Sequence, residues 1–563
     1  MTIETQSRII ETQSGIIETQ TRLRRNKLAV RMALAFTLLG ALNVYSQNSP
    51  RTVSQEFRIA GRVVNSSTGE PLARATVTAL TEQDNHVIAS SLSDADGHFA
   101  IEHLPAGKYP LTASKRGFRT AFYDEHEDFN SAIVTGDGQD TEHLQFQLAP
   151  AAVLHGVVTG DGGDPVDGAS VMLFRIPDPS HPGERVTQVD GTNTDDTGAY
   201  EFGNLAAGEY YVAVKADPWY ALHGRANRNP DNTGTNLDVA FPITFFDSTS
   251  EEASAAPIAL AVGSREEANV NLHAVPALHL TLPRSTRRGA PPVELRQTVF
   301  GSQIQSHGAD MLVVQEGTVE VTGIAPGHYE LTHGDPPRTV DLDAASDLEI
   351  DANAGTPSVT VTGTLRSAAG SPVADAVNLV LEPADDAGGR QPITGFAHKG
   401  QFQFDSVLPG RWNLSVFISN SGQPLPVIAV AKGARVLAGN QIIVAEQPVA
   451  VTVTVSQAPT RIQGFARLNG KPVSGAMIVL VPRDPAAYRS LVRRDQSDSD
   501  GSFSLRDVPP GQYSVLAIED GWKLDWRHRE AISRYLPSGR SVTVGNQSGP
   551  VVRLAEPVES VSP

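Results

Sequence analysis

One pattern of residues recurs along this chain, and such a repeat means that one fold is used several times. Each copy opens with Gly-x-Val or a close variant, a turn ending in Pro, and Ala-x-Val. Some twenty to thirty residues later come Asp-x-x-Gly and an aromatic residue, then Gly-x-Tyr or Gly-x-Trp before an alternating strand. The best-preserved copies carry Gly61, Asp94, Gly97, Phe99 and Tyr109; Gly156, Asp195, Gly198, Tyr200 and Tyr210; Gly363, Gly400, Phe402 and Trp412; and Gly464, Asp498, Gly501, Phe503 and Tyr513. A degenerate third copy keeps only the end of the pattern, around Tyr329.

The repeat predicts β-strands. Stretches such as 75–80 and 210–214 are short, rich in β-branched and aromatic residues, and bounded by Gly, Pro or Asp. Asp-x-x-Gly predicts a hairpin turn, and the aromatic after it should be the first inward side chain of the returning strand. The glycine before each anchor aromatic should adopt a turn conformation that excludes a Cβ. About seven strands per unit of roughly 80–125 residues predict an all-β chain of immunoglobulin-like sandwiches.

These motifs resemble the carboxypeptidase regulatory-like domain, a transthyretin-like β-sandwich close in fold to collagen-adhesin B-type repeats and starch-binding-like domains. The resemblance implies tandem sandwiches joined by short linkers in a secreted bacterial protein. We expect sandwiches at 57–149, 150–275, 276–353 (degenerate), 354–448 and 449–556.

Residues 1–46 read as a leader with a secretory signal peptide. A basic stretch from Arg22 to Arg31 precedes an apolar h-region at 32–42, and Ser46 offers a small residue for cleavage. The apolar run is about half the ~20 residues that span a bilayer, so we expect no transmembrane segment in the mature chain. The predicted destination is the periplasm, the cell surface or the medium.

Composition limits the partners. The chain has no cysteine, so each sandwich must be held by its own apolar core. Its net charge is −18, and removing residues 1–46 takes away six Lys/Arg and three Asp/Glu, which leaves about −21. An acidic surface argues against nucleic acid and anionic lipid as partners. The charge run at 124–128 is expected to be a solvated loop face.

The sequence predicts no enzyme. It contains no His-Glu-x-x-His pair, no Gly-x-Ser-x-Gly elbow and no phosphate-binding glycine loop. We therefore expect no catalytic, cofactor-binding or metal-binding residues and no cofactor. The turns at 94–97, 195–198 and 498–501 hold paired carboxylates, but these and the carbonyls supply only about four of the six to eight oxygens that calcium needs. Hairpin-turn chemistry accounts for the same residues.

Aromatic residues outside the repeat core are the best candidates for ligand contact, because an aromatic ring matches the apolar face of a sugar. They lie after the anchor strands of the second and fifth units: Trp219, Tyr220, Phe245, Phe246, Trp522 and Trp526. The alternative is that they cap sandwich ends or cement neighbouring domains.

The sequence thus favours an exported, non-enzymatic, monomeric string of sandwiches with a structural, adhesive or carbohydrate-binding role. Its partner would be a polysaccharide, extracellular matrix or another protein. The alternative is an accessory chain that docks on a separately encoded peptidase or outer-membrane transporter.

Overall fold

A computed structural model describes residues 55–563 except 83, 179–184, 224–236, 286–291, 307–310, 316, 369, 371–372, 374–375, 385–389, 391, 420–421, 423, 457–459, 486–487 and 546–549. The leader and its predicted signal peptide lie outside the described residues. Residues Glu56–Pro563 belong to one structural unit. Within it the chain is almost entirely β, as the repeat predicts.

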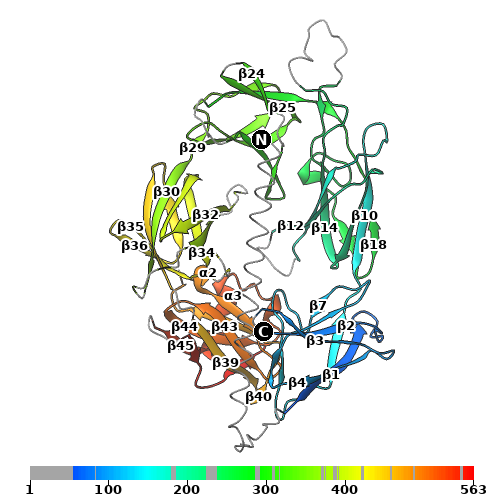
Figure 1. The fold of residues 1–563 in the computed structure, drawn as a ribbon, viewed down its shortest axis with the longest axis vertical. Helices are drawn as coiled ribbons and strands as arrows, with labels where there is room; N and C mark the ends of the chain where they lie inside the picture. The colour runs from blue at the N-terminus through cyan, green and yellow to red at the C-terminus, as the bar shows by residue number, and fades with distance from the viewer. Residues whose placement is uncertain are drawn as a thin grey trace, which may run out of the picture. The chain divides into compact units, whose positions relative to one another are not determined.

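The first sandwich shows the plan that the later ones repeat (Figure 1). In one sheet, β1 (Phe57–Asn65) lies between antiparallel β4 (His98–Leu104) and parallel β9 (Leu144–Leu148). The facing sheet has the order β3 (Val87–Leu92), β2 (Thr76–Leu80), β6 (Leu111–Ser114) and β7 (Ala121–Phe122). A small ladder joins β5 (Gly107–Tyr109) to β8 (Ile133–Thr135).

In each later unit, too, the opening strand lies between an antiparallel hairpin strand and a parallel closing strand. These sets are β10 (Ala152–Thr159) with β13 (Ala199–Leu205), β18 (Arg265–Glu267) and β19 (Val270–Asn271); β21 (Leu278–Pro283) with β25 (Thr318–Ile324) and β28 (Leu348–Glu349); β30 (Val359–Ser367) with β33 (Gln401–Val407) and β38 (Val449–Val455); and β39 (Thr460–Leu468) with β43 (Ser502–Val508), β46 (Val551–Arg553) and β47 (Val558–Val561).

The facing sheets repeat as well. Their strands are β12 (Thr187–Asn193), β11 (Ser170–Arg175), β14 (Gly208–Lys215), β16 (Thr244–Phe245) and β17 (Ile258–Leu260); β23 (Ser302–Gln305), β22 (Glu294–Val299), β26 (Gly327–His333), β27 (Arg338–Ala344) and β29 (Thr356–Pro357); β32 (Ile393–His398), β31 (Ala376–Pro383), β34 (Gly410–Ile418) and β37 (Gln441–Val444); and β42 (Arg493–Gln496), β41 (Met477–Pro482), β44 (Gly511–Ile518) and β45 (Arg540–Val544).

Short elements complete the chain. They are β15 (Val239–Ala240), β20 (Val275–Pro276), β24 (Met311–Gln315), β35 (Val427–Lys432), β36 (Arg435–Ala438), β40 (Lys471–Pro472), α2 (Tyr488–Leu491), α3 (Arg529–Ser533), η2 (Glu252–Ser254), η5 (Gly521–Lys523) and η6 (Leu536–Ser538). No helix among the described residues is long and apolar enough to cross a membrane.

One stretch pairs with a different sandwich from the one the sequence suggested. Residues 449–455, which the expected bounds 449–556 assign to the fifth sandwich, form β38, and every residue of β38 pairs in parallel with β30 of the fourth. The physical reason is the common plan, in which a closing strand returns beside the opening strand of its own unit. The opening strand of the fifth sandwich is β39, which begins at Thr460.

The first and second motifs of the repeat meet across one strand pair. The opening glycine lies opposite the inward aromatic of the hairpin, in the pairs Gly61–Phe99, Gly156–Tyr200, Gly363–Phe402 and Gly464–Phe503. All four aromatics are buried, which confirms that they point inward. A Cβ on Gly363 would lie 2.1 Å from the Phe402 ring. In the fourth and fifth copies the ring thus occupies the space of a glycine side chain. At Gly61 and Gly156 the nearest obstacle is instead a backbone carbonyl, that of Leu144 or Ala268.

The anchor aromatics are fixed by a second recurring contact. Each donates a hydrogen bond from its ring hydroxyl or indole nitrogen to the carbonyl four residues earlier, at 2.6–3.0 Å: Tyr109 to Pro105, Tyr210 to Ala206, Tyr329 to Ala325, Trp412 to Leu408 and Tyr513 to Pro509. This is the arrangement of a tyrosine corner.

The expected turn conformation of the glycines before these anchors is correct in only two of five cases. Gly208 and Gly410 have φ angles of 151° and 152°, whereas Gly107, Gly327 and Gly511 have no positive φ. At Gly511 the restriction comes from the neighbouring ring, because an added Cβ would lie 2.9 Å from the Tyr513 hydroxyl.

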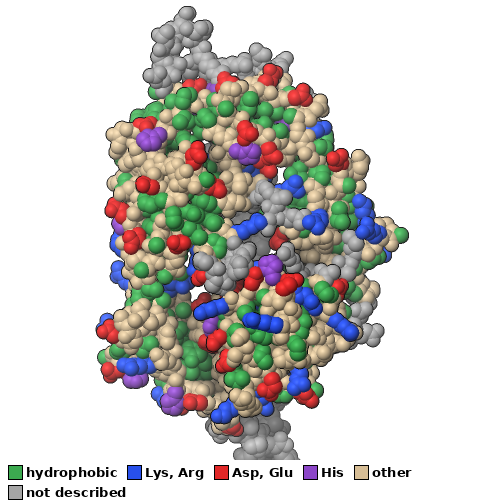
Figure 2. All heavy atoms as spheres, turned by 180° about the vertical axis from the view of Figure 1, so that it is seen from behind, with side chains coloured by type: hydrophobic (Ala, Val, Ile, Leu, Met, Phe, Trp, Pro, Cys, Tyr) green, Lys and Arg blue, Asp and Glu red, His purple; other side chains and the backbone are tan. Residues whose placement is uncertain are grey.

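Acidic and basic side chains are mixed on the face of the molecule that Figure 2 draws. The apolar side chains are gathered into separate clusters, and the largest one fills the fourth sandwich.

Candidate functional site: a groove on the fourth sandwich

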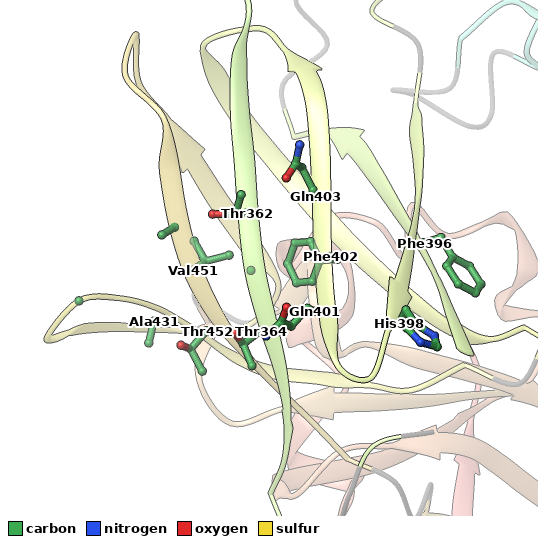
Figure 3. Close-up of a pocket in the computed structure, with 13 residues that line it drawn as sticks. Thr362, Thr364, Phe396, His398, Gln401, Phe402, Gln403, Ala431, Val451 and Thr452 are labelled. Atoms are coloured by element: carbon green, nitrogen blue, oxygen red, sulfur yellow. The ribbon is translucent and has the colours of Figure 1, made fainter. Parts of the chain in front are cut away.

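The fourth sandwich has an addition that widens one of its sheets. The hairpin of β35 and β36 pairs with β38, so the sheet continues past the closing strand in the order β36-β35-β38-β30-β33-β32. A groove of about 840 Å³ lies on this face (Figure 3). This volume falls within the range of small-molecule sites.

Strand alternation explains which side chains line the groove, because every second residue of a strand points to the same face. The cross-strand register places Thr364 opposite both Thr452 of β38 and Gln401 of β33, while Gln401 lies opposite His398 of β32. A second row starts with Ala450, Thr362 and Gln403. The intervening residues of these strands, such as Phe402, point into the core.

The lining combines short hydroxyls, amides and one exposed ring. The side chains of Gln401 and Gln403 lie on the exposed face, and the Gln403 amide donates to the Asp405 carboxylate. Phe396 is 52 % exposed at the edge of the groove. Amides and hydroxyls both donate and accept hydrogen bonds, and a ring offers an apolar platform. This set suits a ligand with many hydroxyl groups and a flat apolar face.

Of the six aromatics selected from the sequence, Trp219 alone is strongly exposed, at 87 %. The adjacent Tyr220 is half-buried, and its ring meets Trp219 edge to face at 5.7 Å. Both lie in the segment that follows β14. This pair remains a predicted contact for sugar.

Phe245 does not offer the ligand contact for which the sequence made it a candidate. Phe245 is 3 % exposed and packs in a cluster with Phe174, and its ring meets Phe300 at 5.4 Å. Because Phe300 follows β22 of the third unit, this cluster joins two neighbouring sandwiches. Phe246 is half-buried against the core of the second sandwich.

Trp522 and Trp526 are not open loop residues either. Trp522 is 7 % exposed, and its indole nitrogen donates to the Gly475 carbonyl at 2.9 Å. Trp526 is half-buried beneath the Arg494 guanidinium, which lies 3.8 Å from its ring centre. Phe245 and Trp522 therefore fit the alternative that we gave for these aromatics, in which they pack between neighbouring sandwiches.

The charge run at 124–128 is exposed at Glu125, Glu127 and Asp128, as predicted for a solvated loop face, but it also makes long-range contacts. Asp124 and Glu127 contact Gln496 and Arg494 of the fifth sandwich. The run is a contact segment, and the sequence could not show this because the partner residues lie more than 360 positions away.

Two of the three aspartate turns, those at 94–97 and 195–198, behave as hairpin chemistry predicts. The Asp94 carboxylate accepts from the backbone N–H groups of Asp96 and His98 at 2.9 and 2.8 Å. Asp195 does the same with Thr197 and Ala199. Among the residues that the structure describes, no group of three or more His, Cys, Asp or Glu could hold a metal ion.

Sequence reasoning missed the groove. A signal was present in the alternating stretch 427–438, which inserts two strands between the anchor strand and the closing strand of the fourth copy. Phe396 gave no indication by itself, because single exposed apolar residues are common.

Comparisons with known proteins agree with the repeat. Residues 58–149 and 153–242 match the carboxypeptidase regulatory-like domain family. None of the curated proteins matches the chain.

Solved structures with similarity include the Bacillus anthracis TIE protein, at 9 % identity over 92 % of this chain and 75 % of that one, with a TM-score of 0.16. A streptococcal ancillary pilin shares 12 % identity over 49 % of this chain and 98 % of its own, with a TM-score of 0.18. The minor pilin GBS52 of Streptococcus agalactiae shares 12 % identity over 41 % of this chain and 100 % of its own, with a TM-score of 0.19. Scores this low carry no argument about function.

Proposed function

We propose that this chain, which contains two tandem carboxypeptidase regulatory-like domains, is an exported, non-enzymatic carbohydrate-binding protein of the periplasm or cell surface. Domains of one fold serve proteins of many different functions, so the family alone does not set the role. The proposal rests on the groove of the fourth sandwich.

The groove supports a binding role rather than a catalytic one. Among the described residues, its lining offers amides, hydroxyls and the imidazole of His398, without a carboxylate beside it to orient the ring as a general base. The long, open sheet face fits an extended chain of sugar units, with Phe396 as the stacking platform and the glutamines as hydrogen-bonding partners.

A glycan array with the mature chain, residues 47–563, tests the proposal and identifies the sugar class. We expect retention of oligosaccharides that present an unsubstituted pyranose face, and loss of that retention in Phe396→Ala. An array without any retained glycan would contradict the proposal.

The variant Trp219→Ala should be measured on the same array. If retention survives Phe396→Ala but is lost in Trp219→Ala, carbohydrate binding belongs to the second sandwich and the groove assignment is wrong. Trp219 is exposed, so its removal should leave the core intact.

A further inference from the structure

Residues 123–135 of the first sandwich, the docking loop, lie against the fifth sandwich. Ser499 donates its backbone N–H to the Ala132 carbonyl at 3.0 Å. In return, the backbone N–H of Ala132 donates to the Asp498 carboxylate at 2.9 Å, and that of Val134 to the Ser499 hydroxyl at 2.8 Å. The contact is therefore specific at the level of the backbone.

The docking face of the fifth sandwich consists of Arg494, Gln496, Ser497, Asp498, Ser499 and Trp522. Its centre is buried and hydrogen-bonded. The Ser131 hydroxyl donates to the Ser497 carbonyl at 2.8 Å and accepts from the Gln496 amide at 2.9 Å. The same amide reaches the Asp124 carbonyl at 2.5 Å.

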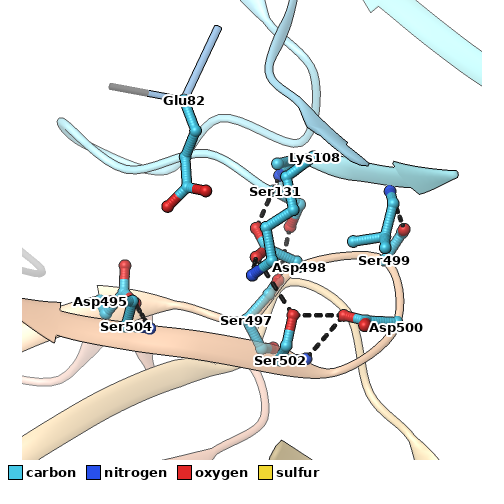
Figure 4. A network of polar contacts seen from close by, with 12 residues as sticks. Glu82, Lys108, Ser131, Asp495, Ser497, Asp498, Ser499, Asp500, Ser502 and Ser504 are labelled. Atoms are coloured by element: carbon cyan, nitrogen blue, oxygen red, sulfur yellow. Dashed lines mark hydrogen bonds and ion pairs between the residues drawn. The ribbon is translucent and has the colours of Figure 1, made fainter. Parts of the chain in front are cut away.

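Opposite charges flank this centre. Lys108, on β5, meets the Asp498 carboxylate at 2.5 Å, and both side chains are largely buried (Figure 4). Arg494 binds Glu127 through both guanidinium nitrogens, at 3.0 and 2.7 Å. Bidentate Arg–carboxylate pairs add geometric specificity to the electrostatic attraction.

An aromatic stack closes the other side. The Trp522 ring is stacked on His126 at 5.2 Å with an interplanar angle of 9°, and Phe129 packs beside it at 5.6 Å. The Arg494 guanidinium lies over the Phe129 ring at 5.1 Å. Buried Trp and Arg anchors are typical of the energetic centre of protein–protein interfaces.

The repeat supplies an internal comparison. The carboxylates of Asp94 and Asp195 accept from backbone N–H groups of their own hairpin turns. The equivalent Asp498 carboxylate accepts from Ala132 and Lys108 of the first sandwich, and within its own turn only from the Ser502 hydroxyl, at 3.3 Å. The Ser502 N–H donates to Asp500. The fifth copy thus departs from the common turn where it contacts the docking loop.

We infer that this contact is an assembly site and that its second partner is another copy of this chain. The docking loop and the docking face are complementary, yet they belong to opposite ends of one chain. A second copy therefore carries a complete match for each of them. Two copies that exchange both contacts close into a pair, as in domain swapping.

Within one chain the contact is favoured by high effective concentration, so the closed monomer prevails in dilute solution. Opening the contact frees both surfaces at once. The first sandwich of one copy then docks on the fifth sandwich of another, with the same hydrogen bonds and ion pairs.

Charge reversal tests this exchange with the full mature chain. Lys108→Glu places a second carboxylate opposite Asp498, and Asp498→Lys places a second ammonium group opposite Lys108. Each variant alone repels its own docking partner and should keep the monomer mass in light scattering. A 1:1 mixture restores opposite charges at both contacts between copies, and we expect its molar mass to double. A mixture that stays at the monomer mass would overturn the inference.

Cysteine pairs give an independent readout, since the chain has no native cysteine. The Ser131 and Ser474 hydroxyl oxygens lie 3.3 Å apart. Ser131→Cys and Ser474→Cys in one chain should form a disulfide without a change in mass, which verifies the geometry. Mixed single variants should form a covalent pair of twice the mass after the chains are opened in mild denaturant and returned to buffer.

The matched control replaces Ser474→Cys by Thr197→Cys, on the corresponding hairpin turn of the second sandwich. If the mixture of Ser131→Cys and Ser474→Cys chains gives no more disulfide-linked pairs than this control, the docking loop does not exchange between copies.

Discussion

Substituting Gly363 by Ala tests whether the repeat is held together by its glycine–aromatic pair. The added Cβ would lie 2.1 Å from the Phe402 ring, far inside van der Waals contact. Phe402 is buried, so it cannot move without disturbing the core. Overpacking of this kind costs about 1–3 kcal/mol. Since about 1 kcal/mol shifts the melting temperature of a domain of this size by about 4–8 °C, the fourth sandwich should unfold visibly earlier.

A double-mutant cycle separates this cause from general disruption. Phe402→Ala should cost about 3–5 kcal/mol by leaving a cavity. In the double variant the new methyl group occupies part of that cavity, so the combined loss should fall short of the sum by about 1 kcal/mol or more. Trp412, buried in the same sandwich, reports its unfolding by fluorescence alongside calorimetry.

Gly203→Ala is the matched control, because Gly203 lies in strand β13 with nothing within 4 Å of an added Cβ. It should be neutral or slightly stabilising. If Gly363→Ala were as harmless as this control, or if the two losses in the cycle simply added, the pairing argument would be refuted.

Other predictions concern the fifth sandwich and the anchors. Tyr513→Phe removes the hydrogen bond to Pro509 and should cost about 1 kcal/mol, whereas Tyr513→Ala should cost about 3–5 kcal/mol, as read from calorimetric transitions. Gly208→Val should destabilise the second sandwich by about 1–3 kcal/mol, because valine is strained at the φ angle of 151°. Gly327→Ala should cost less, because Gly327 has no positive φ and alanine adds only a methyl group; chemical denaturation measures both losses. Burial raises the pKa of Asp495 from 3.8 to about 6, so this group binds its proton more tightly in the folded state and its contribution to stability falls as pH rises through that window. Asp495→Asn should therefore gain up to about 3 kcal/mol over the wild type near pH 7.5 and almost nothing near pH 4, and equal gains at both pH values would contradict the assignment.

The sequence predicted the sandwich plan well because its motifs are local. Asp94 and Gly97 close a turn, and Phe99 points inward, for reasons contained within six residues. The pairing of Gly61 with Phe99 was not predicted, because it depends on the register between two strands and not on one local motif.

What the sequence could not predict depends on distant surfaces. Trp522 and the 124–128 run look like loop residues until the fifth sandwich is placed against the first. The groove likewise needs four strands in register, so that Thr364, Gln401 and His398 share one face. Neither arrangement follows from the spacing of residues along one segment.

Retention on insoluble polysaccharides is the most direct test of the carbohydrate-binding groove. The mature wild-type chain, Phe396→Ala and Phe465→Ala should be compared in one pull-down. Phe465 is the matched control, since it is 47 % exposed on β39 and does not line the groove. We predict that the wild type and Phe465→Ala are retained on the same polysaccharide and that Phe396→Ala is not. Equal retention of all three chains, or of none, would contradict the account.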